Sequence, residues 1–268
     1  MVGTTAKADL PLPDNVRRYY FPGVSHGGGS GGFSTTTPAV NGCELPSNPA
    51  PTAPMRSALM RSFIEWVTTG AAMPASTYPR ISDGTLVPPM PQEKLGFPKI
   101  PGVTYTGLKS TRYLLNYGPV FYKAGIISIN PPVITPPMFD NPANGPIYPT
   151  YVPKTDADGN DVAGVRLPDV TVPLATYTGW ALRAGAQAND GCEGTGQMIL
   201  FPKTNADRIA SGDPRLSIEE RYSSLAAYTS QVTRAVDGMV ANRLMLKEDV
   251  EANLARLIQA GRATGVLK

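Results

Sequence analysis

The sequence is poor in the side chains that bind metals, since its 268 residues include one histidine and two cysteines. A tetrahedral zinc site needs four such ligands, so a site of that kind is excluded. No stretch approaches the roughly 20 apolar residues of a membrane span, and residues 1–9 lack the apolar core of a signal peptide. We therefore predict no metal, no cofactor and no membrane segment.

Charged residues are also scarce, at 17% of the chain against a usual share of about 25%. The net charge of +3 is too small to favour nucleic-acid binding. Glycine and proline are abundant instead, with 27 and 28 residues, which indicates many turns and ordered loops. A hydrophobic content of 41% supports a packed core, so we expect a loop-rich globular protein.

The two cysteines, Cys43 and Cys192, both lie in glycine-rich segments. They could form one disulfide that closes a long loop, which would be worth about 4–5 kcal/mol. They could equally remain free thiols, because this N-terminus does not reveal the redox compartment. The sequence leaves both possibilities open.

The first third of the chain predicts a strand, a glycine-rich loop and a helix. Residues 16–21 are typical of a strand that ends before Pro22 and Gly23, and residues 27–50 form a long loop. A helix is expected from about residue 52 to 69, with Thr52 as its N-cap. Its core-facing stripe is expected at Met55, Leu59, Phe63 and Val67.

The rest of the chain is proline-rich before it turns helical. Short strands are expected at 103–106, 120–122 and 125–129, and an extended run at 170–178. Residues 155–160 predict a hairpin tip, because the chain lacks the glycine and glutamate that a calcium loop needs at its sixth and twelfth positions. Two helices close the chain: the first follows the capping box at Ser217 to Glu220, and the last runs from Lys247 to about Gly261.

His26 is the one side chain whose ordinary pKa suits proton transfer near neutral pH. It begins an H-G-G-G run that matches an esterase oxyanion motif, but that motif requires a second, catalytic histidine. Residues 28–32 match G-x-S-x-G around Ser30, yet they lack the preceding strand and the following helix of a nucleophile elbow. His26 itself fits a catalytic base on a loop between a strand and a helix, or a histidine bonded within its own loop.

Several segments match a family pattern, beginning with residues 19–29 (YYFPGVSHGGG) and 41–49. The others are residues 66–70, 78–87, 166–170, 173–180 and 210–222. Together they resemble the bacterial family usually called α/β-hydrolase domain-containing proteins. The resemblance implies an exported serine hydrolase that cleaves esters, extracellular or periplasmic, with His26 as general base. It also implies that this chain is the C-terminal part, so the nucleophile, the acid and the oxyanion donors would lie in a missing N-terminal half, and this chain alone would be inactive.

These observations predict an α/β fold: the C-terminal portion of an α/β-hydrolase sheet, a loop-rich β extension and a C-terminal helix pair. Residues 1–84 would hold the last strand, the histidine loop and the final helix of the hydrolase core. Residues 85–212 would form the extension, and 213–268 the helix pair. The alternative is a non-catalytic binding or scaffold module that presents the aromatic and proline-rich surface of residues 85–180.

Overall fold

The computed structural model describes residues 7–36, 38–39, 42–109, 112–113, 115–130, 133–134, 147–192 and 194–268. Its three long helices are α1 (Ala53–Thr69), α7 (Leu225–Ala241) and α8 (Val250–Ala263). The shorter helices are α2 (Gln92–Leu95), α3 (Phe121–Ala124), α4 (Pro168–Thr171), α5 (Asn205–Ser211) and α6 (Ile218–Arg221). Single 3₁₀ turns occupy Gly185–Gln187 and Lys247–Asp249.

The strands pair in antiparallel twos. The pairs are β1 (Leu86–Val87) with β6 (Val152–Pro153), β2 (Arg112–Tyr113) with β5 (Ile147–Tyr148), β3 (Leu115–Asn116) with β4 (Val133–Ile134), and β7 (Ala175–Thr178) with β8 (Gln197–Leu200). Within the described ranges, the one parallel contact is an isolated bridge between Tyr19 and Thr77. In those ranges, the expected portion of an α/β-hydrolase sheet is therefore represented by short antiparallel pairs and this bridge.

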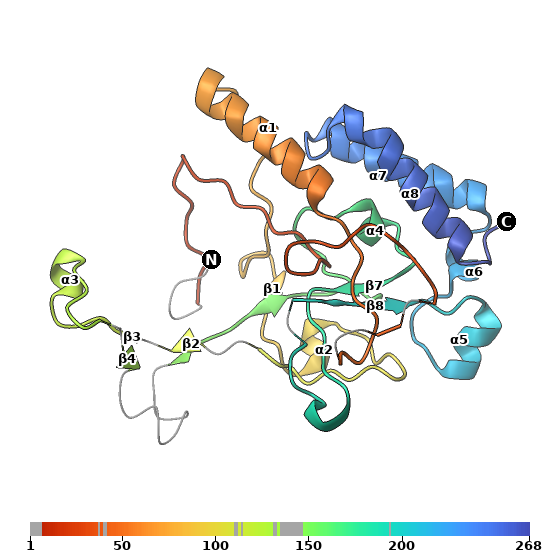
Figure 1. The fold of residues 1–268 in the computed structure, drawn as a ribbon, viewed down its shortest axis with the longest axis horizontal. Helices are drawn as coiled ribbons and strands as arrows, with labels where there is room; N and C mark the ends of the chain where they lie inside the picture. The colour runs from red at the N-terminus through yellow and green to blue at the C-terminus, as the bar shows by residue number, and fades with distance from the viewer. Residues whose placement is uncertain are drawn as a thin grey trace.

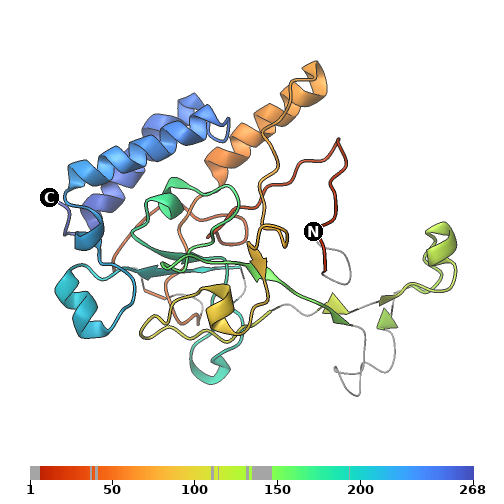
Figure 2. The ribbon, with the colours of Figure 1, turned by 180° about the vertical axis from the view of Figure 1, so that it is seen from behind.

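The β7–β8 pair forms the centre of the fold, since hydrophobic clusters cover both of its faces. Successive strand residues point to opposite faces, and accordingly Tyr177 and Met198 join the main core while Ile199 joins a second cluster. The main core contains Val232 and Val236 of the α7–α8 helix pair, which lies over this face together with α4 (Figures 1 and 2). The second cluster packs Phe97, Tyr105 and Trp180 with ring centroids 5.5–5.7 Å apart.

The main core draws on all three of the expected segments. Met55 comes from the first, Val170 from the second and Leu257 from the third. The boundaries at 84/85 and 212/213 themselves stay a prediction.

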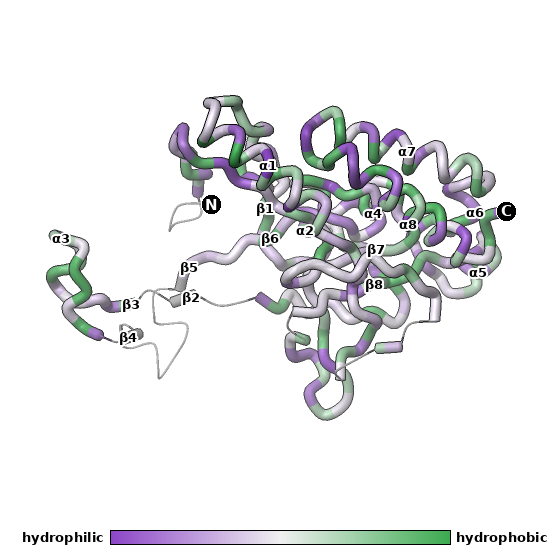
Figure 3. The backbone as a smooth tube through the Cα atoms, turned by 45° about the horizontal axis from the view of Figure 1, so that its top comes forward, coloured by the Kyte–Doolittle hydropathy of each residue, from purple (hydrophilic) through white to green (hydrophobic). Residues whose placement is uncertain are grey.

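The β2–β5 and β3–β4 ladders form an arm that extends from the body and carries α3 at its tip, where hydrophobic positions are visible in Figure 3.

The helix predictions are largely confirmed, with two exceptions on α1. Gly70 ends α1 with a left-handed φ of 77°, and the capping box at Ser217 and the final helix occur as expected, although α6 and α7 are separate helices. Thr52 precedes α1 but makes no side-chain cap, and its hydroxyl donates to the Gly27 carbonyl at 3.4 Å. The expected core stripe is half wrong: Met55 and Leu59 are buried, but Phe63 and Val67 are 48% and 69% exposed.

Several strand predictions are wrong. Residues 103–106 and 125–129 form no strand, 120–122 runs into α3, and 170–178 begins with α4 before β7. Residues 16–21 are extended, and the bridge that they form within the described ranges is the one between Tyr19 and Thr77. The turn at 155–160 is confirmed as a hairpin tip, closed by the antiparallel bridge between Thr155 and Asp161.

Candidate functional site

His26 lies on a loop between the Tyr19 bridge and α1, and its side chain is exposed. Its backbone N–H donates to the Gly194 carbonyl at 3.2 Å, which fixes the main chain at this residue. Within the described part of the chain, no group forms a hydrogen bond or an ion pair with the imidazole. Among these residues, the bond within its own loop that the alternative expected is therefore not found.

Asn48 holds the start of the histidine loop. Its buried amide Nδ2 donates to the carbonyls of Gly23 at 2.8 Å and Thr178 at 3.0 Å, while its Oδ1 accepts the Ala50 N–H at 2.9 Å. One side chain thus connects the loop, the end of β7 and the approach to α1. Gly23 has a φ of 59°, and a Cβ there would lie 2.9 Å from the Tyr177 carbonyl oxygen, so this position requires glycine.

The glycines after His26 allow two stretches of backbone to lie in direct contact. Gly29 N–H donates to the Ala50 carbonyl at 2.8 Å, and Gly31 N–H donates to that of Pro49 at 2.7 Å. A Cβ on Gly29 would lie 2.2 Å from the Pro49 carbonyl carbon, so a side chain would break this contact. The glycine run therefore packs the loop against the start of α1.

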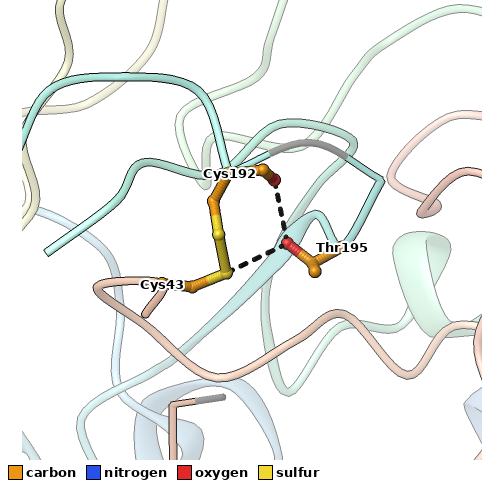
Figure 4. Close-up of a disulfide and its surroundings, with 3 residues drawn as sticks. All are labelled: Cys43, Cys192 and Thr195. Carbon is orange, nitrogen blue, oxygen red and sulfur yellow. Dashed lines mark hydrogen bonds between the residues drawn. A yellow bond between two sulfur atoms is a disulfide. The ribbon is translucent and has the colours of Figure 1, made fainter. Parts of the chain in front are cut away.

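A disulfide fixes the segment around Gly194, which contacts the backbone of His26. Cys43 and Cys192 are bonded, with Cα atoms 5.6 Å apart, which resolves the question that the sequence left open. The Thr195 hydroxyl donates to the Cys192 carbonyl at 3.1 Å and lies 3.6 Å from the Cys43 sulfur (Figure 4). The backbone carbonyl of Thr195 accepts a hydrogen bond from the Asn48 N–H at 3.3 Å. The disulfide thereby holds the turn that binds the backbone of His26.

These segments enclose a hollow of about 530 Å³ beside His26. Hydroxyl groups dominate its polar lining, and Phe33, Pro49 and Met198 supply its apolar part. The hydroxyls belong to Ser25, Ser30, Ser34, Ser47 and Thr195. Those of Ser25 and Ser47 have no hydrogen-bond partner among the described residues, and no carboxylate of the described chain lines the hollow. The described lining therefore combines one imidazole with several hydroxyl groups.

A buried carboxylate supports the extended segment that leads to the site. Asp161 accepts a hydrogen bond from the Tyr20 hydroxyl at 2.7 Å and another from the Gly23 N–H. Burial raises the pKa of Asp161 to about 6, although both of these hydrogen bonds oppose the rise. Asp161 therefore binds the N–H of Gly23, and Asn48 binds its C=O.

The structure does not assemble the other sequence motifs into a site. Ser30 lines the same hollow, but it lies in a loop with no strand before it and no helix after it. The amides of Gly28 and Gly29 already donate to Ser25 and Ala50, so they form no oxyanion hole. No cluster of metal ligands and no helix able to cross a membrane occurs in the described residues.

Sequence reasoning identified His26 but missed the residues that hold it. Asn48 and Asp161 act on Gly23 from 25 and 138 positions away, and no local pattern marks such contacts. The proline after Asn48 and the glycines at 27–29 indicated a loop, but not its partners.

Comparison with known proteins assigns the chain to a family. A family model described as "Alpha/beta hydrolase domain" matches residues 3–255. The chain belongs to this family, as its resemblance indicated. Neither the curated proteins nor the solved structures gave a significant match.

Proposed function

We propose that this chain carries the general-base histidine of a serine-type ester hydrolase and acts as the C-terminal part of that enzyme. The supporting observation is the exposed imidazole of His26, which is held by its backbone beside a hollow of about 530 Å³ and has no partner in the described chain. Membership in the hydrolase family makes proton transfer the natural use of such a ring.

In this role, the neutral imidazole accepts the proton of a serine hydroxyl as the hydroxyl attacks the ester carbonyl. The same ring then returns the proton to the departing alkoxide, and a water molecule repeats the sequence to release the acid. The serine, the oxyanion donors and the acid would come from the remaining part of the hydrolase. The hydroxyls around the hollow would contact the bound ester.

An extracellular or periplasmic location belongs to the same proposal. The Cys43–Cys192 disulfide supports it, because disulfides persist in oxidising compartments. The partners would then be a small-molecule ester and the N-terminal half of the domain.

The alternative of a scaffold that presents aromatic residues finds little support. Three aromatic residues of that segment, Phe97, Tyr105 and Trp180, pack against each other in the second cluster. That role also required His26 to be shielded by its loop, whereas the side chain is exposed.

The test is turnover of p-nitrophenyl esters by this chain alone and by the chain joined to the segment encoded upstream. We expect turnover only from the joined protein. Equal turnover by this chain alone, lost on His26→Ala, would contradict the proposal and point to a local nucleophile such as Ser30. Labelling with a fluorophosphonate followed by peptide mapping would identify that serine.

A further inference from the structure

The extended segment before His26 has one paired and one unpaired edge. Arg18 and Tyr20 face Thr77: Tyr20 N–H donates to the Thr77 carbonyl and Thr77 N–H donates to that of Arg18, both at 2.9 Å. In a strand, neighbouring residues direct their backbone groups to opposite edges. Arg17, Tyr19 and Phe21 therefore face the other way, and their backbone N–H and C=O groups have no partner in the described ranges of the chain.

The residues of this unpaired edge also line a groove of about 510 Å³. Arg17, Tyr19 and Phe21 line one side, and the other side is the face of α1 that carries Met60, Phe63 and Trp66. Figures 1 and 2 show the outer half of α1 projecting from the body, and the side chains of Met60 and Phe63 are 60% and 48% exposed. Phe63 is one of the residues that the sequence pattern expected in a core.

The groove combines unpaired backbone groups with an apolar helix face, and one extended ligand could contact both. Unpaired backbone groups are a template for strand pairing, and the apolar helix face can bury every second side chain of an added strand. The groove is also cationic, because the lining residues Arg17 and Arg56 have no carboxylate partner among the described residues, although the Arg17 guanidinium lies over Trp66 at 4.7 Å.

We propose that this groove binds an extended peptide strand that has alternating apolar side chains and a carboxylate, adding it to the edge formed by Arg17, Tyr19 and Phe21. This rests on the proposed function in one respect, since the strand would belong to the partner that supplies the nucleophile. A strand that runs parallel to residues 17–21 ends beside the loop of His26, and catalytic groups of α/β sheets lie at such strand ends.

The test uses the full chain and a synthetic peptide of about six residues that alternates valine and threonine and ends in aspartate. Hydrogen exchange followed by NMR reports the amides individually. We expect saturating peptide to slow exchange of the Tyr19 and Phe21 amides about tenfold or more, and to leave Tyr20, already bonded to Thr77, unchanged. A peptide methylated on its edge-facing amide nitrogens removes the pairing donors and should bind at least about tenfold more weakly.

Matched variants locate the site. Phe63→Glu should weaken peptide binding about tenfold, whereas Ile126→Glu, which changes a comparably exposed residue on the arm, should not. His26→Ala should bind the peptide as the unmodified chain does, so failure of the hydrolase proposal and failure of this one are distinguishable. Absence of amide protection, or equal binding of the methylated peptide, would overturn the proposal. So would a dimer that Phe63→Glu dissociates, because a second copy would then occupy the groove.

Discussion

Replacing Asn48 by alanine should destabilise the protein and displace the histidine loop together. The change deletes three hydrogen bonds of 2.8, 3.0 and 2.9 Å and leaves the Gly23 carbonyl, the Thr178 carbonyl and the Ala50 N–H without their partner. A buried polar group left unsatisfied costs about 1–3 kcal/mol. Because carbonyls can recover part of their bonding from water in the space vacated, we expect a total loss of about 3 kcal/mol.

Urea unfolding followed by circular dichroism measures this loss. The matched control is Asn242→Ala, whose amide bonds the Gly238 carbonyl on the exposed surface and should cost less than about 0.5 kcal/mol. Since His26 is the only histidine, the Hε1 proton of its ring gives a single histidine Hε1 NMR signal that reports the loop without further assignment. That signal should shift in Asn48→Ala and stay in place in the control. A loss below about 1 kcal/mol with an unmoved histidine signal would refute the role assigned to Asn48.

Two further predictions concern the supports of the site. Cys43→Ser should lower the free energy of unfolding by about 5 kcal/mol, because the disulfide closes a loop with a sequence separation of 149; an unchanged urea midpoint under oxidising conditions would contradict this. Asp161, whose pKa is raised to about 6 in the folded chain, should contribute stability that is full below about pH 4 and lost as the pH rises through 6, by about 3 kcal/mol. Asp161→Asn should remove this pH dependence, and an unchanged pH dependence of the unfolding free energy would rule it out.

The helices were predictable because their signals are local. The apolar spacing of α1, α7 and α8 lies within each helix, Gly70 ends α1, and the capping box at Ser217 forms as the sequence indicates. One failed strand prediction shows a conflict between two local signals. Residues 120–122 have strand-forming side chains, yet Gly125 takes a φ of 70° and ends a helical turn there, so local backbone geometry prevailed over β propensity.

The buried polar contacts could not be predicted, because their partners are distant in sequence. Arg215 is buried against β7 and β8, where it bonds the Thr176 hydroxyl at 2.8 Å, the Ile199 carbonyl at 3.0 Å and Asp213 at 2.6 Å. A sequence pattern would place such an arginine on the surface. His26 was identifiable because it is a unique residue type in a glycine loop, whereas its supports depend on the tertiary fold.

The central claim is that the imidazole of His26 transfers the proton of a hydroxyl supplied by the rest of the hydrolase. The most direct test is the rate of p-nitrophenyl acetate hydrolysis by the joined protein, with and without His26→Ala. The account predicts a loss of about a thousandfold or more with the same unfolding midpoint. A His26→Ala protein that retains the full rate would contradict it.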